Sequence, residues 1–209
     1  MKIKLFKMGM LHTNCYVASE DKDAVIIDPP MYSREVADYI EENKLEVRAI
    51  LLTHGHFDHA LGSPEFSKKY GVKVYMSKDD RDLLFDCTKD GAYVVGVSFK
   101  APEFPPLEYA ADGDELTFGK LKFRVISTPG HTAGGLSYYN EADGVLFSGD
   151  TLFHSCVGRS DLYSSSTEDL VHSIREKLYK LPDSTKVYCG HGDFTDIGFE
   201  KKNNLYIPE

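Results

Sequence analysis

Four short turns that carry histidine or aspartate each come directly after an apolar run of the chain. These turns hold five of the eight histidines, and their sequences are Thr53-His54-Gly55-His56-Phe57-Asp58-His59, Gly130-His131-Thr132, Gly149-Asp150-Thr151 and Gly190-His191-Gly192. An apolar run ahead of a turn is typical of a buried strand. Because strand ends converge on one edge of a packed sheet, side chains far apart in the sequence can meet there. The chain is therefore expected to fold so that the four turns lie together.

The segments between these turns predict two similar halves built from strands and helices. In the first half, alternating and apolar runs indicate strands at residues 2–8, 14–19, 24–28, 47–53 and 72–76. Helices are expected after a cap at Ser33, over residues 60–70 and over the acidic stretch 79–85. Residues 87–107 are rich in glycine, proline and aromatic side chains, and they predict a loop in which Tyr93, Phe99 and Phe104 form an apolar wall of a site.

The second half repeats this plan. Residues 116–118 and 121–126 predict a hairpin, and strands are expected at 136–139, 145–148 and 186–189. Thr167 is expected to cap a helix whose apolar stripe contains Leu170, Ile174, Leu178 and Leu181. Two sheets packed face to face, with helices on both outer surfaces, would bury all of these stripes. The predicted fold class is therefore α/β, a four-layer αββα sandwich.

Length and composition narrow the choice of partners. A chain of 209 residues with 42% hydrophobic content is expected to form one domain over residues 1–209. The formal net charge of -9 disfavours nucleic acid and anionic membrane surfaces as partners. No apolar stretch suits a signal peptide or a membrane span, and the four cysteines form no CxxC pair. We therefore expect a cytoplasmic protein that acts on a small molecule, with its oligomeric state left open.

The residue types in the four turns predict a metal site. Imidazole nitrogens and carboxylate oxygens suit zinc, and divalent iron or manganese as well. The groups in question are His54, His56, Asp58, His59, His131, Asp150 and His191. Seven groups are too many for one tetrahedral ion, but they suit two divalent ions that share a carboxylate and a hydroxide. The sequence therefore predicts a catalytic site with two metal ions, most simply zinc.

These motifs also resemble a known superfamily. The run THGHFDH at residues 53–59 resembles the HxHxDH signature of metallo-β-lactamase-fold hydrolases, and the later GHT, SGDTLF and CGHGD segments are similar to its other ligand motifs. The resemblance implies that His54, His56 and His131 hold one ion. It implies that Asp58, His59 and His191 hold the second, and that Asp150 bridges the two. Asp58 would also carry a proton during hydrolysis.

A narrower resemblance concerns the substrate. The segment Gly149-Asp150-Thr151-Leu152-Phe153, followed by Gly158-Arg159-Ser160-Asp161, is similar to glyoxalase II enzymes, which hydrolyse hydroxyacyl-glutathione thioesters. The opening Thr13-Asn14-Cys15-Tyr16 is similar as well. The stretch after His191 is too short for the helical domain of the two-domain enzymes, and residues 195–204 instead resemble short glyoxalase II-like proteins. Arg159 is expected to pair with a substrate carboxylate and Tyr163 to line the same pocket.

Other functions remain compatible with these motifs. Persulfide dioxygenases resemble the same family but use a single iron, so the metal content and oxygen consumption would distinguish them. A β-lactamase or a lactonase also fits the HxHxDH signature. A tRNA-processing nuclease would require a basic surface, which the net charge disfavours. A non-enzymatic metal-binding sensor would bind metal without turnover.

Overall fold

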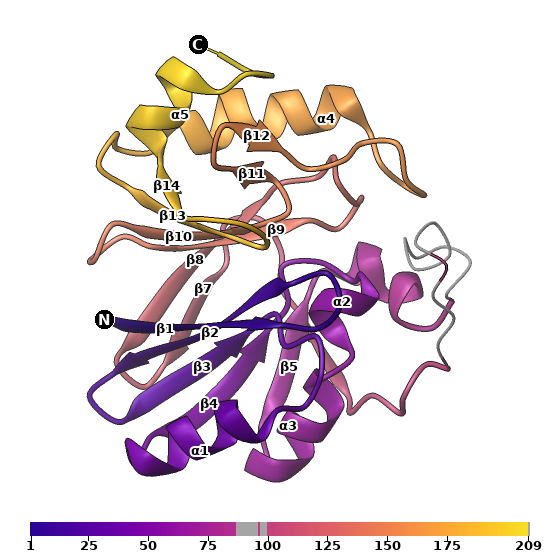
Figure 1. The fold of residues 1–209 in the computed structure, drawn as a ribbon, viewed down its shortest axis with the longest axis vertical. Helices are drawn as coiled ribbons and strands as arrows, with labels where there is room; N and C mark the ends of the chain where they lie inside the picture. The colour runs from indigo at the N-terminus through magenta and orange to yellow at the C-terminus, as the bar shows by residue number, and fades with distance from the viewer. Residues whose placement is uncertain (87–95, 97–99, 209) are drawn as a thin grey trace.

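The computed structural model describes residues 1–86, 96 and 100–208. Within them two six-stranded sheets pack face to face (Figure 1). The first sheet has the order β1 (Lys2–Met8), β2 (Thr13–Glu20), β3 (Asp23–Ile27), β4 (Glu46–Leu51), β5 (Lys73–Met76) and β6 (Leu107–Tyr109). The second has the order β14 (Thr195–Asp196), β13 (Lys186–Cys189), β10 (Val145–Gly149), β9 (Leu136–Asn140), β8 (Leu121–Ser127) and β7 (Glu115–Phe118).

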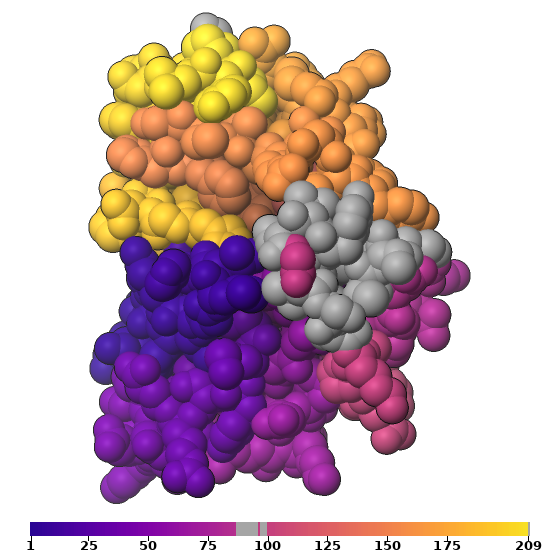
Figure 2. All heavy atoms as spheres, turned by 45° about the vertical axis from the view of Figure 1, so that its right-hand side comes forward, coloured from indigo at the N-terminus to yellow at the C-terminus, as the bar shows by residue number. Residues whose placement is uncertain are grey.

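Helices cover the outer face of each sheet, which completes four layers (Figure 1). Helices α1 (Arg34–Glu42) and α3 (Ser63–Tyr70) lie against the first sheet, and α4 (Thr167–His172) and α5 (Ile197–Asn203) lie against the second. The two halves of the chain occupy opposite ends of the molecule, as the change from indigo and magenta to orange and yellow shows (Figure 2). The predicted αββα sandwich is confirmed.

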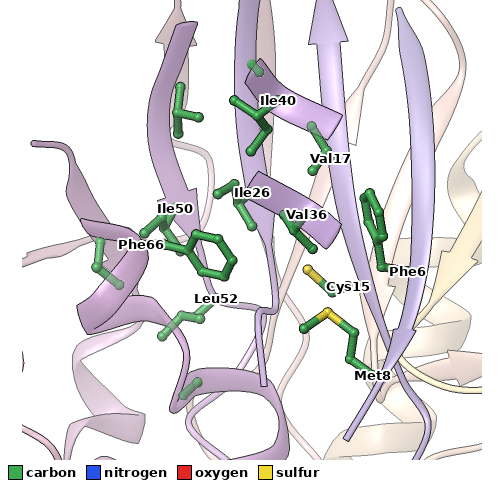
Figure 3. Close-up of a cluster of buried hydrophobic side chains, with 14 of the residues drawn as sticks. Phe6, Met8, Cys15, Val17, Ile26, Val36, Ile40, Ile50, Leu52 and Phe66 are labelled. Atoms are coloured by element: carbon green, nitrogen blue, oxygen red, sulfur yellow. The ribbon is translucent and has the colours of Figure 1, made fainter. Parts of the chain in front are cut away.

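Three apolar clusters hold the layers together. Under α1 and α3, side chains such as Val36, Ile40 and Phe66 pack on Ile26 and Ile50 of the first sheet (Figure 3). A second cluster fills the space between the sheets, where its largest members include Phe123, Tyr138 and Phe147. The third lies beneath α4 and α5. Burial of a large apolar side chain contributes about 1.5–3 kcal/mol, so these interfaces fix the spacing of the layers.

The apolar stripe predicted for the late helix is confirmed, but the predicted cap is wrong. Leu170, Ile174 and Leu178 are all buried in the third cluster. The helix begins one residue earlier than expected, because the cap is Ser166, which has extended backbone dihedrals and whose hydroxyl accepts a hydrogen bond from the Asp169 amide. Thr167 is thus the first helical residue. After His172 the chain continues as a wider helical turn, Ser173–Lys177, and a tight one, Leu178–Lys180.

The helix predicted over residues 60–70 is split in two. The structure has a single turn, α2 (Phe57–Ala60), before α3 begins at Ser63. The break brings Gly62 against the backbone of Met31, where an added Cβ would lie 2.5 Å from the Met31 carbonyl carbon. Ser33 is the residue before α1, as expected, but its side chain makes no capping hydrogen bond. The acidic stretch forms the short helix η1 (Lys78–Leu84).

The strand ends bring the four turns to one edge of the sandwich. Strands β3, β4 and β5 are parallel, as are β10 and β13, so their carboxyl ends face the same way. The Leu136 amide of the second sheet donates to the Thr53 carbonyl beyond β4 of the first, over 2.7 Å. The Asn14 amide of β2 donates to the Gly190 carbonyl, also over 2.7 Å. The two sheets are thus joined by hydrogen bonds at the turns themselves.

Most of the loop predicted over residues 87–107, including Tyr93 and Phe99, lies outside the described residues. Among the described residues, no helix has the length and apolar character needed to span a bilayer.

Candidate metal centre

Three buried histidines from two of the turns form the first group of potential ligands. His54 and His56 follow β4, and His131 follows β8. One ligand atom of each lies within 4.8 Å of the others. The His56 Nδ1 and His131 Nε2 atoms are 3.0 Å apart. Burial, and then the neighbouring histidines, hold the pKa of His54 and of His56 well below the ordinary value. A lowered pKa favours the neutral imidazole, which is the form that binds metal ions.

The second group contains Asp58, His59 and His191. The Nε2 atoms of His59 and His191 are 3.2 Å apart. The Asp58 Oδ2 atom is 3.3 Å from His191 Nε2 and 3.5 Å from His59 Nε2. These three side chains come from two turns separated by more than a hundred residues, and the geometry brings all three ligand atoms within 4.8 Å of one another.

Asp150 lies between the two groups. Its Oδ1 atom is 3.5 Å from His59 Nε2, and its Oδ2 atom is 3.6 Å from His131 Nε2 and 3.5 Å from His191 Nε2. One carboxylate therefore reaches a member of the first group and two members of the second. The position depends on a glycine, because a Cβ on Gly190 would lie 2.1 Å from Asp150 Oδ1. The seven residues predicted from the sequence are thus gathered at one place.

In two of the histidine rings, the nitrogen that faces away from the cluster donates a hydrogen bond to a backbone carbonyl. His131 Nδ1 donates to the Arg159 carbonyl over 2.8 Å, and His191 Nδ1 donates to the Leu11 carbonyl over 3.1 Å. With its Nδ1 hydrogen engaged in this way, each ring turns Nε2 toward the centre. A contact to the second ring nitrogen is the usual means of orienting a metal-binding histidine.

Asp28 is a buried residue whose role the sequence did not predict. It accepts hydrogen bonds from the Thr53 amide over 2.7 Å, the Thr53 hydroxyl over 2.6 Å and His59 Nδ1 over 3.0 Å. The Thr53 oxygen is in turn 3.0 Å from His54 Nδ1, so Asp28 orients one histidine of each group. Its oxygens also lie within 4.8 Å of ring nitrogens of His54 and His59. Since they already accept three hydrogen bonds, we interpret Asp28 as a support for the ligands. The sequence carried one signal, an aspartate that closes a buried apolar run.

Asp80 is the second missed residue. It is 1% exposed and accepts hydrogen bonds from the Gly55 amide over 3.0 Å, the Thr132 hydroxyl over 2.7 Å and the Gly134 amide over 2.7 Å. Burial raises the pKa of Asp80, although the three donors oppose that shift. Asp80 thereby joins the turn with His54 and His56 to the turn with His131. As part of an acidic stretch, it had no distinguishing signal in the sequence.

In the second group, the aspartates and the histidines shift one another's pKa. Burial lowers the pKa of His59, but Asp58, Asp150 and Asp28 outweigh burial and raise that pKa to about 10. Burial also lowers the pKa of His191, but Asp58 and Asp150 outweigh burial and raise that pKa above its ordinary value. In turn, His59 and His191 outweigh burial and hold the pKa of Asp58 below its ordinary value. Without a metal ion, protons on the rings balance the carboxylates; a divalent cation would replace them.

A cavity of about 430 Å³ opens above this cluster. His56, Asp58, His131, Asp150 and His191 line its base, and its walls contain Leu11, Phe57, Phe153, Cys156, Val157, Arg159 and Leu162. The walls are thus mostly apolar, as in pockets that bind small molecules. Arg159 supplies a guanidinium that pairs with Asp161 through two contacts of 2.9 Å. Tyr163 is half exposed and is not among the residues that line the cavity.

Comparisons with known proteins agree with this geometry. Residues 8–191 match the metallo-beta-lactamase superfamily. The chain is 32% identical to hydroxyacylglutathione hydrolase GloC of Haemophilus influenzae, over 99% of this chain and 98% of that protein. Its structure is similar to the crystal structure of the BLEG-1 B3 metallo-beta-lactamase, with a TM-score of 0.87, 34% identity and full coverage of both chains. It is equally similar to TTHA1623 in a di-iron-bound form, with a TM-score of 0.87, 31% identity and coverage of 98% of this chain and 100% of the other.

Proposed function

Because the chain belongs to the metallo-beta-lactamase superfamily, which includes metal-dependent hydrolases, we propose that it is a hydrolase of small thioesters such as S-hydroxyacyl glutathione. The observation that carries the proposal is the convergence of seven histidine and aspartate side chains, five of which line the base of a cavity with mostly apolar walls. The similarity to hydroxyacylglutathione hydrolase GloC supports the choice of substrate.

The residues present fit divalent metal ions. The His54 Nε2 and Asp150 Oδ1 atoms are buried and have no hydrogen-bond partner among the described residues. Polar atoms buried in this way are costly unless something pairs with them. We propose that His54, His56 and His131 would hold one ion, that Asp58, His59 and His191 would hold a second, and that Asp150 would bridge them. Zinc suits these ligands, and the di-iron-bound neighbour supports iron as the alternative.

When bound, such ions would polarise a carbonyl group and acidify water. The remaining roles belong to side chains of the chain. Leu11, Phe57 and Phe153 would exclude bulk water from the acyl group and sulfur of the substrate. Arg159 would exchange its contact with Asp161 for a carboxylate of the substrate, and Tyr163 would contact the part that extends out of the cavity.

The position of Asp58 supports a role in proton transfer. It lines the cavity, and its Oδ2 atom accepts a hydrogen bond from the Thr13 hydroxyl over 3.1 Å. During hydrolysis a bond forms between the water oxygen and the carbonyl carbon, and the carbon–sulfur bond breaks with its electron pair on sulfur. We propose that Asp58 takes the proton lost by water and passes it to the departing thiolate. The products are a carboxylic acid and a thiol.

A substrate panel tests the proposal. Metal-loaded protein would be assayed with lactoyl-glutathione, other acyl thioesters, a homoserine lactone, a cephalosporin and glutathione persulfide. We expect thioester cleavage to be the fastest reaction by kcat/KM. Oxygen consumption with the persulfide and no thioester cleavage would replace the proposal by a dioxygenase. Cleavage of the cephalosporin or lactone alone would indicate the activity of another branch of the superfamily. Metal binding without any turnover would indicate a sensor.

A further inference from the structure

A buried carboxylate outside the metal centre holds one wall of the cavity. Glu200 of α5 is fully buried. Its two oxygens are 3.0 and 3.1 Å from the Ser155 amide, and they accept hydrogen bonds from the Thr195 hydroxyl over 2.6 Å and the Asn204 side-chain amide over 2.8 Å. A buried carboxylate is tolerated only when it has such donors, so this residue fixes the groups around it.

The segment that Glu200 contacts is a small hairpin. Strands β11 (Leu152–Phe153) and β12 (Cys156–Val157) have two residues each. Ser155, in the connection, has a φ of 58°, in the left-handed region that costs a non-glycine residue about 1 kcal/mol. A hairpin this short is not stable by its own pairing. Its position therefore depends on contacts with neighbouring elements.

Helix α5 and Asn204, the residue directly after it, supply those contacts at three successive residues of the hairpin. The His154 ring lies on the Phe199 ring with centroids 5.0 Å apart. The Ser155 amide donates to Glu200, and the Asn204 side chain donates to the Cys156 carbonyl over 3.1 Å. Figure 1 shows both elements on the outer face of the second sheet. Phe153, Cys156 and Val157 of the same hairpin line the cavity.

We propose that Glu200 is a positioning residue that fixes the β11–β12 wall and thereby the fit of the substrate, an inference that rests on the proposed thioester hydrolysis. Three candidate ligands are held from outside the hairpin, since Asp28 contacts His59 and, through Thr53, His54, and the Leu11 carbonyl holds His191. Loss of the Glu200 contacts should therefore move the wall and leave the metal cluster in place. The consequence is weaker substrate binding with the bond-breaking step little changed.

The test uses Glu200→Gln in the full-length, metal-loaded protein. Glutamine keeps one acceptor oxygen and replaces the other by an NH2 group. That group faces the Ser155 amide and either the Thr195 hydroxyl or the Asn204 side-chain amide, all of which donate to Glu200 in the wild type, so at least one of these hydrogen bonds is lost or reversed. With lactoyl-glutathione we expect KM to rise roughly tenfold, the size expected for one lost pocket contact, with kcat within about twofold. Hydrogen exchange measured by mass spectrometry should become faster over residues 152–158, with metal content unchanged.

Asp196→Ala is the matched control. Asp196 caps the same helix through the Phe199 amide, and none of its hydrogen bonds or ion pairs with the described residues reaches the hairpin. Its loss should weaken the start of α5 while the Glu200 contacts remain, so KM and the exchange of residues 152–158 should stay close to those of the wild type. If Glu200→Gln fails to fold, Asn204→Ala removes the contact with Cys156 and carries the same prediction.

A wild-type KM together with unchanged exchange in Glu200→Gln would overturn the inference. An equal rise of KM in Asp196→Ala would also overturn it, because the effect would then come from general destabilisation. If the wild-type protein cleaves no thioester, the proposed function fails, and the exchange measurement decides the inference about Glu200 by itself.

Discussion

The Asp28 carboxylate accepts a hydrogen bond from His59 Nδ1 over 3.0 Å, in the buried layer behind the metal centre. This contact turns His59 Nε2 toward Asp58, Asp150 and His191. A carboxylate in this position also makes the imidazole a stronger ligand. The arrangement of the second group of ligands therefore depends on a residue that is not proposed as a ligand.

The first prediction concerns this support. Asp28→Asn keeps the shape of the side chain, and asparagine tolerates the φ of 50° at this position. We expect the affinity for the more weakly held ion to fall about 10- to 100-fold, as is typical when an orienting partner is lost. Competition with a chelator measures the change. Asp23→Asn, at the start of strand β3, which ends just before Asp28, removes the charge that pairs with Arg48. It is the control and should bind metal as the wild type does. Equal affinities in all three proteins would contradict the role given to Asp28.

The second prediction separates the bridging carboxylate from the proposed substrate contact. Asp150→Ala removes the group that reaches both ligand sets, so kcat should fall roughly a thousandfold or more. Arg159→Ala removes a charge-assisted contact on an exposed side chain, so KM should rise roughly tenfold with kcat nearly unchanged. Steady-state kinetics with a thioester check both. An Arg159→Ala protein with both metals bound and kcat as low as that of Asp150→Ala would show that the arginine has been assigned wrongly.

The third prediction concerns the pH dependence of the stabilisation that the Asp196 cap gives to helix α5. The Asp196 carboxylate accepts a hydrogen bond from the Phe199 amide over 2.8 Å, and this contact, with Lys186, holds the pKa of Asp196 below its ordinary value of 3.8. Because the pKa is lower in the folded state, the stabilisation is present above the ordinary value and is lost as the pH falls through the folded-state pKa. At pH 7, Asp196→Ala should lower the free energy of unfolding by about 1 kcal/mol.

Urea unfolding at a series of pH values checks this cap. The difference between the wild type and Asp196→Ala should shrink below about pH 4. Asp196→Asn is the matched variant, since asparagine caps helices without ionising, and it should stay close to the wild type at neutral pH. A difference that remains constant down to the lowest pH at which the protein is folded would mean that ionised Asp196 is not the stabilising group.

The sequence was sufficient to predict the layers and the proposed ligands because both depend on local patterns. A buried strand requires an apolar run, and a turn that supplies a ligand requires histidine or aspartate at its end. The runs before His54, Asp150 and His191 satisfy both conditions. Similar reasoning located the stripe of Leu170, Ile174 and Leu178, which the structure buries.

The supporting residues could not be predicted in this way, because their roles depend on donors from distant segments. Asp80 looks like any residue of an acidic stretch until Gly55, Thr132 and Gly134 are placed around it. Glu200 precedes two lysines in the sequence, and its burial depends on the packing of α5, where its oxygens contact Ser155 of the hairpin, Thr195 and Asn204. The break before α3 likewise follows from the approach of Gly62 to Met31, a contact between segments about thirty residues apart.

The proposed two-ion site makes its most direct prediction about metal content. Elemental analysis of protein saturated with zinc, iron or manganese, and then freed of unbound ions, should give close to two ions per chain. His191→Ala should reduce the number toward one, since His191 belongs to the second group of ligands, whereas the exposed His172→Ala should keep two. One ion per chain at saturation, with the same value in His191→Ala, would contradict the account.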